Sequence, residues 1–328
     1  MRPFAYERAR DAAGALAASA EVPGTRYLGG GTNLVDLMKL GVEQPARLVD
    51  VSRLPMDAVE ELPDGGLRIG ANVRNSDLAV SESVRERYPL LSQALLSGAS
   101  GQLRNRATIA GNLLQRTRCA YFQDVSKPCN KRAPGSGCPA REGDHRNLAI
   151  LGHSPACVAT HPSDMAVAMV AIGGEVHVLG SRGTRTIPLG GLHRLPGDEP
   201  ERDTVLEPGD LVTAVELTPM RYARRSRYRK VRDRASFSFA VVSLAAAVDL
   251  GDGTVRDCRL AFGGLAHAPW RALRAEELLR GAPATPESFA RAADAELEQA
   301  LPLRDNAFKV PLARNVLVRT LTELCEAP

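Results

Sequence analysis

The chain has 328 residues, of which 44% are hydrophobic and 24% charged, and its net charge is only +4. This length predicts two or three packed units, and the composition is ordinary for a globular protein. The weak positive charge and the 4% aromatic content argue against a nucleic-acid partner. No apolar run is long enough for a membrane helix, and the N-terminal segment lacks the continuous apolar core of a signal peptide.

The N-terminal part of the chain has the pattern of a βαβ unit. Apolar spacing predicts a helix over residues 11–20 and a second over 34–40. An extended segment at 25–28 and a short buried strand at 48–51 complete the unit.

The middle of the chain is less regular. The patterns predict a hairpin around 66–70, helices over 83–97 and 165–172, and paired strands at 175–179 and 185–188. Residues 115–157 differ, because Cys, Pro, Gly, Arg and Asn dominate without any periodicity. A loop of this length is uncommon inside a compact domain unless something besides backbone pairing orders it.

An arginine-rich segment, residues 221–234, marks the expected domain boundary and predicts either a solvated linker or a surface for an acidic partner. Two strands are expected beyond it, over 238–250 and 254–262, and the Asp252-Gly253 pair between them is a strong hairpin signal. Helices are expected around 271–279, 286–301 and 312–323.

Two small-residue turns are candidate phosphate sites. The first, Gly29-Gly30-Gly31-Thr32-Asn33, joins an expected strand to an expected helix, and the second is Thr108 to Asn112. Glycine lets backbone N–H groups approach an anion closely, and Thr and Asn add side-chain donors. Neither turn has the P-loop or G-x-G-x-x-G spacing, so a plain tight turn remains the alternative for each.

Four of the six cysteines fall in the irregular segment: Cys119, Cys129, Cys138 and Cys157. They are separated by nine, eight and eighteen residues. Structural zinc usually uses short Cys-x2-Cys pairs, whereas an iron–sulfur cubane offers four separate iron corners and suits wide spacing. A [4Fe–4S] cluster, zinc, a disulfide pair and free thiols all stay open. Cys258 and Cys325 read as ordinary small residues, and His161 is the one histidine of interest.

The motifs together resemble the FAD-binding subunit of the molybdenum hydroxylases, the xanthine dehydrogenase family. The resemblance rests on the two turns, on Pro162-Ser163-Asp164, on Tyr228-Arg229-Lys230 and on Phe262-Gly263-Gly264. It covers essentially the whole chain. The amino-acid sequence of the cysteine segment resembles that of the FAD/[4Fe–4S] subunit of periplasmic-type aldehyde oxidoreductases.

This resemblance implies an α+β fold. Residues 1–220 would form a two-lobed FAD-binding domain of the vanillyl-alcohol-oxidase type, with a cysteine-rich insertion at about 115–160. Residues 221–328 would form a C-terminal domain with a small antiparallel sheet and helices.

The resemblance also implies the cofactor contacts. The two turns would wrap the FAD pyrophosphate, Asp164 would hold the ribose or adenine side, and Lys230 would lie near the flavin ring, where a cation raises the reduction potential. The residues implied at the FAD site are Arg26, Tyr27, Leu28, Gly29, Gly30, Gly31, Thr32, Asn33, Leu34, Thr108, Ile109, Ala110, Gly111, Asn112, Asp164 and Lys230. Without the resemblance, Asp164 reads as a helix N-cap and Lys230 as a solvated cation.

The implied metal ligands are Cys119, Cys129, Cys138 and Cys157, holding a [4Fe–4S] cluster that either relays electrons or orders the insertion. The implied function is electron transfer without catalytic residues on this chain beyond the flavin. A molybdenum-cofactor subunit would oxidise an aldehyde or heterocycle, and a [2Fe–2S] subunit would pass the electrons to FAD, in a three-subunit assembly that is doubled in some members.

Two alternatives remain beside this interpretation, a subunit of a 4-hydroxybenzoyl-CoA-reductase-like complex and a non-catalytic zinc-binding scaffold. The resemblance further implies synthesis and cofactor loading in the cytoplasm. It allows later export to the periplasm together with a signal-bearing partner.

Overall fold

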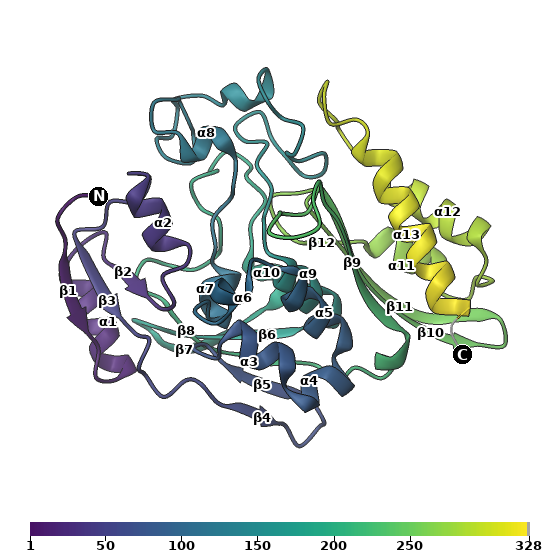
Figure 1. Ribbon diagram of the computed structural model, residues 1–328, viewed down its shortest axis with the longest axis horizontal. Helices are drawn as coiled ribbons and strands as arrows, with labels where there is room; N and C mark the ends of the chain where they lie inside the picture. The colour runs from purple at the N-terminus through teal and green to yellow at the C-terminus, as the bar shows by residue number, and fades with distance from the viewer. Residues whose placement is uncertain (327–328) are drawn as a thin grey trace.

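Three β-sheets with helices packed between and around them organise the chain, and the computed structural model describes residues 1–326 (Figure 1). Two sheets belong to the N-terminal part and one to the C-terminal part. The expected α+β fold is therefore confirmed. None of the helices in these residues has both the length and the apolar character needed to cross a membrane.

The first lobe is the expected βαβ unit with one more strand. Its parallel sheet has the order β1-β3-β2, and Asp11 caps the first helix by accepting from the Gly14 N–H at 2.6 Å. The elements are β1 (Ala5–Arg8), α1 (Ala12–Glu21), β2 (Arg26–Leu28), α2 (Leu34–Lys39) and β3 (Arg47–Asp50).

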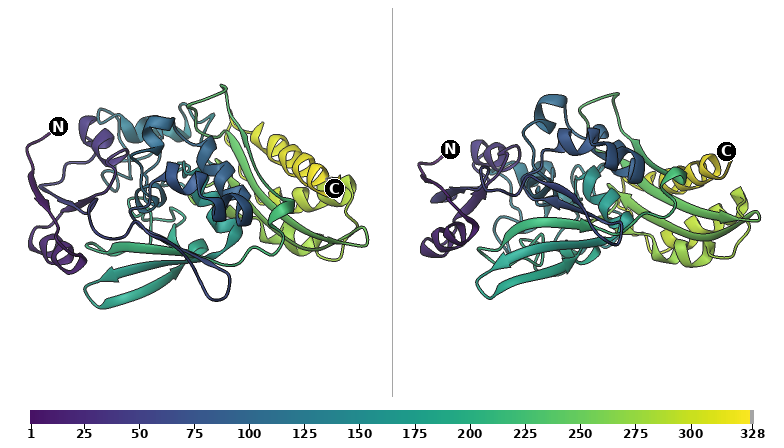
Figure 2. Two further views of the ribbon diagram at one scale, coloured as in Figure 1. Left: turned by 60° about the horizontal axis from the view of Figure 1, so that its bottom comes forward. Right: turned by 90° about the horizontal axis from the view of Figure 1, so that it is seen from below.

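The second lobe contains a five-stranded antiparallel sheet of order β4-β5-β8-β6-β7. Helices cover one face of this sheet (Figure 2). Its strands are β4 (Val59–Glu61), β5 (Leu67–Gly70), β6 (Gly174–Gly180), β7 (Gly183–Pro188) and β8 (Leu211–Leu217). Its helices are α3 (Asn75–Val80), α4 (Glu82–Arg87), α5 (Pro89–Ser97), α6 (Gly101–Arg104), α7 (Ile109–Leu113), α9 (Asp164–Ile172) and α10 (Leu189–Leu192).

The single helix expected over 83–97 is two helices, α4 and α5, that meet at Tyr88. Pro89 is the physical reason, because its ring disfavours the helical conformation of the residue before it. Tyr88 accordingly has φ −136° and ψ 51°, outside the helical region, and Pro89 begins the new helix.

Helix α9 forms the centre of the molecule, since all nine of its residues are buried. It packs against α5 of the second lobe and against β10 and β11 of the C-terminal sheet. Ser163 caps it by accepting from the Ala166 N–H at 2.9 Å, so the interpretation of Asp164 as the N-cap is wrong by one residue.

The C-terminal domain has a four-stranded antiparallel sheet of order β12-β11-β10-β9, and Figure 1 shows its three helices on the side away from α9. The expected hairpin is confirmed, with Asp252 and Gly253 both at positive φ. The elements are β9 (Ser226–Val231), β10 (Val242–Gly251), β11 (Thr254–Gly263), β12 (Trp270–Arg271), α11 (Leu273–Leu279), α12 (Pro286–Leu297) and α13 (Lys309–Glu326).

The arginine-rich segment 221–234 is not a linker, because strand β9 runs through it. The short 3-10 helix η2 (Ala223–Arg225) precedes the strand, and Tyr228 turns into the core between Arg227 and Arg229. The strand expected from 238 begins at Val242 instead, which leaves residues 232–241 as the connection between β9 and β10.

The cysteine-rich segment projects from the top of the molecule in Figure 1, and we call residues 115–160 the loop lobe. Its regular structure is limited to α8 (Ala120–Gln123) and the 3-10 helix η1 (Pro139–Arg141). The C-terminal domain holds this lobe from the side. The Asn306 side chain donates to the carbonyls of His145, Leu148 and Ala149 at 3.3 Å each.

Lys309 completes this attachment with a fully buried ammonium group. Its Nζ donates to the carbonyls of Leu148 at 2.9 Å and Gly264 at 2.8 Å, which joins the loop lobe to the C-terminal sheet. Burial, with a smaller effect of Arg146, lowers the pKa of Lys309 to about 7 from 10.5.

This pKa predicts a pH-dependent stability. Between about pH 7 and 10.5 the unfolded chain binds more protons at this lysine than the folded chain does, so its contribution to the free energy of unfolding rises with pH. We expect the stability gained by Lys309→Met, relative to the wild type, to decrease as the pH rises across this window. Urea unfolding at both ends of the window measures the difference. The matched control is Lys127→Met, because Lys127 is exposed. If the stability difference between Lys309→Met and the wild type does not change with pH, as expected for Lys127→Met, the assignment is contradicted.

Candidate FAD and metal sites

The two glycine turns lie against each other, although 74 or more residues separate them in the sequence. A Cβ on Gly30 would come within 2.0 Å of the Arg106 carbonyl oxygen, and one on Gly29 within 3.1 Å of the Thr108 hydroxyl. Backbone can approach backbone this closely only where no side chain intervenes. Glycine at position 30 is therefore required for the two turns to meet.

A cavity opens on each side of this meeting point. The smaller, about 260 Å³, lies between the two lobes and includes the segment 26–34. The larger, about 690 Å³, extends toward the C-terminal domain and reaches Phe237 and Phe239. The residues that line both cavities are Gly31, Thr32, Asn33 and Gly111. The arrangement suits a long ligand whose middle lies on the turns and whose two ends fill separate cavities.

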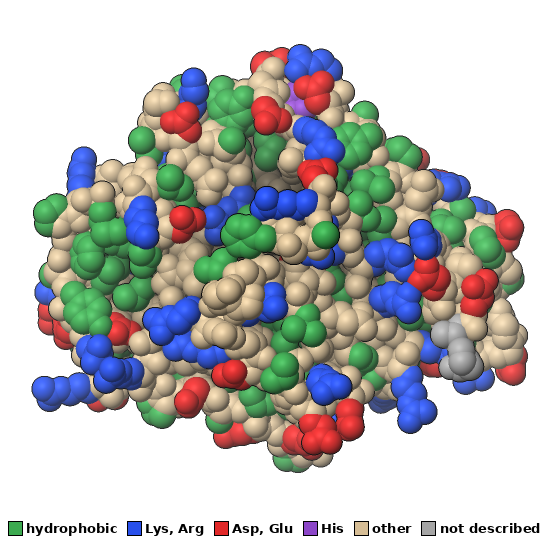
Figure 3. All heavy atoms as spheres, viewed as in Figure 1, with side chains coloured by type: hydrophobic (Ala, Val, Ile, Leu, Met, Phe, Trp, Pro, Cys, Tyr) green, Lys and Arg blue, Asp and Glu red, His purple; other side chains and the backbone are tan. Residues whose placement is uncertain are grey.

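Figure 3 shows that Lys and Arg side chains gather around the middle of this face, below the loop lobe. Arg104, Arg118 and Arg234 line the larger cavity. A cleft bordered by cations attracts an anionic ligand and raises its local concentration.

The first turn supplies the free donors. Within residues 1–326, no protein acceptor pairs with the backbone N–H groups of Gly30, Gly31 and Thr32. The Asn33 side chain accepts from the Arg116 N–H through Oδ1 at 3.0 Å, and its buried Nδ2 has no partner. A buried donor without an acceptor, as Asn33 Nδ2 is, costs free energy, and phosphate oxygens would satisfy it together with the three half-buried N–H groups. The diphosphate of FAD therefore fits the first turn.

The second turn differs from the expectation, because its amides are already used. The N–H groups of Ile109 and Ala110 donate to Val73 and Ala71 at 3.1 Å, and that of Gly111 donates to the Thr108 hydroxyl at 3.1 Å. Ile109 itself is fully buried in the core. The turn therefore contributes a wall and side chains to the cleft rather than a set of free amides.

Asn112 is the polar side chain of the second turn. Its Oδ1 accepts from Ser163 at 2.6 Å and from Gln115 at 2.7 Å, and the residue lines the larger cavity. The side-chain amide therefore has its oxygen occupied by protein donors, as in Asn33, and its NH2 group left for a ligand.

The smaller cavity takes its walls from the other residues that the sequence implicates. Arg26, Tyr27, Leu28 and Leu34 all line it, and so does Ala110. The Tyr27 hydroxyl donates to the Gly209 carbonyl at 2.7 Å, which ties the first lobe to the edge of the second. The structure thus brings the first-turn residues and their neighbours to one cleft.

Asp164 and Lys230, implied at different parts of the cofactor, form one buried ion pair. Lys230 Nζ lies 2.7 Å from Asp164 Oδ2 and donates to the Ser97 carbonyl at 3.1 Å, while the Tyr228 hydroxyl donates to Asp164 Oδ1 at 2.6 Å. Burial raises the pKa of Asp164, although Lys230 and Tyr228 favour its ionised form. The charge of Lys230 is thus offset inside the protein. The roles of both residues toward FAD stay predictions.

This pair predicts a strongly non-additive result. We expect Lys230→Met to lower the free energy of unfolding by about 3 kcal/mol or more, because it leaves a buried carboxylate unpaired. Adding Asp164→Asn should recover most of this loss, since the neutral amide can still accept from Tyr228. Urea unfolding of both variants measures the effect, and a double variant as unstable as the single one would contradict it.

The four cysteines of the loop lobe line one small cavity, and we call this group the thiol cage: Cys119, Cys129, Cys138 and Cys157. Cys119 and Cys157 are buried, and the other two are partly exposed. Phe122 and Ala140, both buried, close the walls. The sequence-predicted ligands are thus brought together by a segment with little regular structure of its own.

The spacing of the sulfur atoms bears on what the cage can hold. Among the described residues, no three of these sulfurs lie within 4.8 Å of one another. A zinc ion bound by four thiolates at about 2.3 Å requires sulfurs roughly 3.8 Å apart. In an iron–sulfur cubane each sulfur binds its own iron corner, so a wider cage fits. Four thiols around one cavity are a donor set that an iron–sulfur cluster can use.

The two buried cage thiols, Cys119 and Cys157, are neutral without a metal. Burial raises the pKa of Cys119 to about 11 and that of Cys157 to about 12. Metal binding must therefore displace protons. Backbone N–H groups face the sulfurs, as when Ala159 donates to Cys157 Sγ at 3.5 Å, and such bonds stabilise a thiolate ligand.

The remaining sulfur and histidine candidates lie apart from the cage. Cys258 is fully buried in strand β11, and Cys325 lies in α13. His161 is buried against His193 with ring centroids 4.2 Å apart, and its Nε2 has no hydrogen-bond partner among residues 1–326. Burial and then His193 lower the pKa of His161 well below its usual range, so this ring stays neutral.

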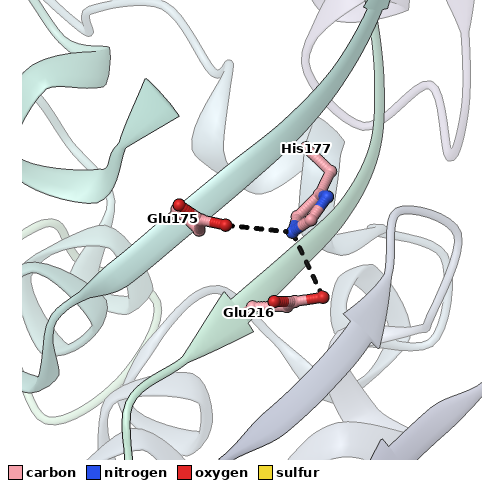
Figure 4. Close-up of side chains that lie close together, drawn as sticks. All are labelled: Glu175, His177 and Glu216. Carbon is pink, nitrogen blue, oxygen red and sulfur yellow. Dashed lines mark ion pairs between the residues drawn. The ribbon is translucent and has the colours of Figure 1, made fainter. Parts of the chain in front are cut away.

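A second polar group, Glu175, His177 and Glu216, lies on the outer face of the five-stranded sheet (Figure 4). His177 Nε2 lies 3.5 Å from Glu175 and 3.2 Å from Glu216. Arg68 pairs with Glu216 and approaches His177 Nδ1 at 3.5 Å. The guanidinium already supplies the cation of this group, so we interpret it as a surface ion-pair network.

Three residues of the site were missed from the sequence: Arg116, Asp203 and His267. Arg116 Nε lies 2.7 Å from Asp203 Oδ2, across 87 residues of chain. His267 Nδ1 donates to the Arg194 carbonyl at 2.8 Å, and its Nε2 accepts from Lys131 Nζ at 2.6 Å. Partners this distant leave no local pattern, and only the fold reveals them.

The comparisons with known proteins agree with this geometry. Residues 2–219 match the model described as the FAD binding domain in molybdopterin dehydrogenase, and residues 226–324 match the CO dehydrogenase flavoprotein C-terminal domain. The aldehyde oxidoreductase FAD-binding subunit PaoB of Escherichia coli is 50% identical over 325 residues, covering 98% of each chain. The glyceraldehyde dehydrogenase medium chain of Sulfolobus acidocaldarius is 27% identical, over 85% of this chain and 81% of its own.

The fold is also that of a chain in a solved structure. Reconstituted CO dehydrogenase from Oligotropha carboxidovorans contains a chain that superposes with a TM-score of 0.77 at 20% identity, covering 99% of this chain and 98% of its own. Together with the family models, the free donors of the first turn and the paired cavities, these matches show that the chain belongs to the family of FAD-binding subunits of the molybdenum hydroxylases.

Proposed function

We propose that this chain is the electron-transfer flavoprotein subunit of a molybdenum-containing aldehyde oxidoreductase. The observation that carries the proposal is the 50% identity, over 98% of each chain, to an aldehyde oxidoreductase FAD-binding subunit. FAD would lie across the two glycine turns. Bound there, it would supply both one-electron and two-electron chemistry and so connect iron–sulfur centres to an external acceptor.

The thiol cage is the second part of the proposal, as the site of a [4Fe–4S] cluster. The convergence of four cysteines on one cavity supports it, as does an N–H group that donates to a cage sulfur. Among the described residues no three of these sulfurs lie within 4.8 Å of one another, which favours a cluster over one shared zinc ion. Cys119 and its neighbour Arg118 line the cavity between the cage and the FAD cleft. This proximity favours an electron relay over a purely structural cluster.

The substrate chemistry is assigned to partners. One partner would carry the molybdenum cofactor and oxidise the aldehyde, and a second would carry [2Fe–2S] clusters that deliver electrons to this chain. We further propose that cofactors are loaded in the cytoplasm and that the assembly is then exported to the periplasm with a signal-bearing partner.

Anaerobic titration of the purified assembly with an aromatic aldehyde tests this function. The expected result is loss of the oxidised-flavin absorption together with formation of the carboxylic acid. A reductive complex of the 4-hydroxybenzoyl-CoA-reductase type predicts the opposite response, in which aldehydes leave the flavin oxidised and an aryl-CoA thioester reoxidises the reduced flavin. That outcome would overturn the proposal.

A further inference from the structure

The first glycine turn is connected to a partly buried carboxylate, Asp203, that lines neither cofactor cavity. Asn33 Oδ1 accepts from the backbone N–H of Arg116 at 3.0 Å, and this bond leaves the donor end of the Asn33 amide for a ligand. The Arg116 guanidinium lies between two carboxylates, 2.7 Å from Glu43 and 2.7 Å from Asp203. Asp203 is therefore one of the two carboxylates that hold the Arg116 side chain, and the backbone N–H of the same residue orients Asn33.

Asp203 is also bonded to the thiol cage, through Lys131. Lys131, two residues after Cys129, lines the cage cavity and is itself buried. Its Nζ bonds Asp203 Oδ1, the Pro200 carbonyl at 2.7 Å and His267 Nε2 at 2.6 Å. Asp203 thus receives one cation from the cage side and one from the FAD side.

Arg116 also touches the cage directly. Its guanidinium lies over the ring of Phe122, 4.7 Å from the centroid, and Phe122 is a fully buried wall of the cage cavity. A movement of Phe122 would therefore displace the Arg116 guanidinium through this cation–π contact, in addition to any effect through the ion pairs.

The pKa of Asp203 reflects its interaction with Lys131 and Arg116. Burial alone would raise the pKa of Asp203, but Lys131 and Arg116 together hold it well below its usual range. Neutralising this carboxylate would leave two cations, the buried Lys131 and the partly buried Arg116, without the anion between them, which is unfavourable. The arrangement is stable only while Lys131, Asp203 and Arg116 keep their present positions.

We propose that Asp203 is a positioning residue that couples the two cofactor sites, so that occupation of the thiol cage strengthens dinucleotide binding at the first glycine turn. The cage consists mostly of irregular chain, and metal ligation orders such a segment. Ordering of the cage segment fixes the position of Lys131, which pairs with Asp203. Asp203 in turn pairs with the Arg116 side chain, and the Arg116 backbone N–H binds Asn33 Oδ1. The Asn33 NH2 group then faces the diphosphate. By thermodynamic linkage, dinucleotide binding strengthens metal loading by the same factor.

The inference rests on the proposed cluster, so the first experiment tests whether the cluster forms, before the coupling is measured. The intact chain is reconstituted anaerobically with iron and sulfide, and bound iron and acid-labile sulfide are measured. The cage-deficient form carries Cys129→Ser and Cys138→Ser. Failure of the wild type to take up iron and sulfide would refute the cluster and this coupling together.

The FAD dissociation constant is then measured by flavin fluorescence for the loaded and cage-deficient forms. We expect the loaded wild type to bind FAD about 10-fold more tightly, within the range usual for coupled sites. Equal affinities in a chain that does hold iron and sulfide would overturn the coupling and leave the proposed function intact.

Substitution of Asp203 tests the route. Asp203→Asn should bring the ratio of the two dissociation constants below about 3-fold, whereas Asp203→Glu should restore part of it, because the charge is kept. The matched control is Asp257→Asn, a carboxylate of similar exposure, 33% against 25%, that pairs with Arg280 far from both cavities. Its ratio should equal that of the wild type. An unchanged ratio in Asp203→Asn would contradict the assignment.

The reciprocal measurement needs no substitution at Asp203. A chelator competes for the iron of the wild-type chain with and without FAD, and we expect FAD to slow or reduce iron loss. Iron loss that is identical in both conditions would contradict the coupling even if Asp203→Asn does not fold.

Discussion

Gly30→Ala should weaken FAD binding by roughly 100-fold while leaving the thiol cage intact. The added Cβ would lie 2.0 Å from the Arg106 carbonyl oxygen and 3.1 Å from the Ala107 Cα, so backbone must move. Forcing a methyl group into close-packed backbone costs on the order of 3 kcal/mol, and the same energy corresponds to roughly 100-fold in affinity. Equilibrium binding of FAD to the purified variant measures the loss.

The control separates the effect of this contact from that of an added methyl group. Gly190 has open space where a Cβ would stand, so Gly190→Ala should bind FAD like the wild type. A Gly30→Ala protein with unchanged FAD affinity would show that the two turns do not hold the cofactor between them.

Cys157→Ser should empty the thiol cage. Cys157 is a buried member of the cage, and a hydroxyl group is a poor ligand for iron, so the remaining three thiols cannot complete the site. We expect bound iron and acid-labile sulfide to fall at least about 10-fold, which corresponds to about 1.4 kcal/mol. The loop lobe should also become more sensitive to protease, because the metal no longer orders it.

Cys258→Ser is the matched control, since Cys258 is an equally buried cysteine outside the cage, in strand β11. It should keep its iron and sulfide even if its stability falls. Loss of iron in both variants alike would indicate general unfolding rather than loss of a ligand.

Local patterns predicted much of the fold and of the candidate site. The βαβ unit, the Asp252-Gly253 hairpin and the buried helix α9 were readable because each depends on neighbouring residues. The break between α4 and α5 was not predicted, because the apolar spacing continues across it. Pro89 was the local signal that could have revealed it. Strand β9 was missed because its alternating arginines resemble a solvated charge run until Tyr228 is seen to face the core.

The parts that could not be predicted depend on contacts across the fold. The ion pair of Asp164 and Lys230 joins residues 66 positions apart, and that of Arg116 and Asp203 joins residues 87 apart. Each of these residues has an ordinary local setting. The second turn shows the same limit, because its glycine-like pattern gave no sign that Val73 and Ala71 already use its amides.

The most direct test is the cofactor content of the wild-type protein. We predict that it is purified with a flavin absorption band over a broad iron–sulfur shoulder, with about one FAD released on denaturation and about four irons with matching acid-labile sulfide per chain. A colourless protein, or one that contains zinc in the cage and no flavin, would contradict the account.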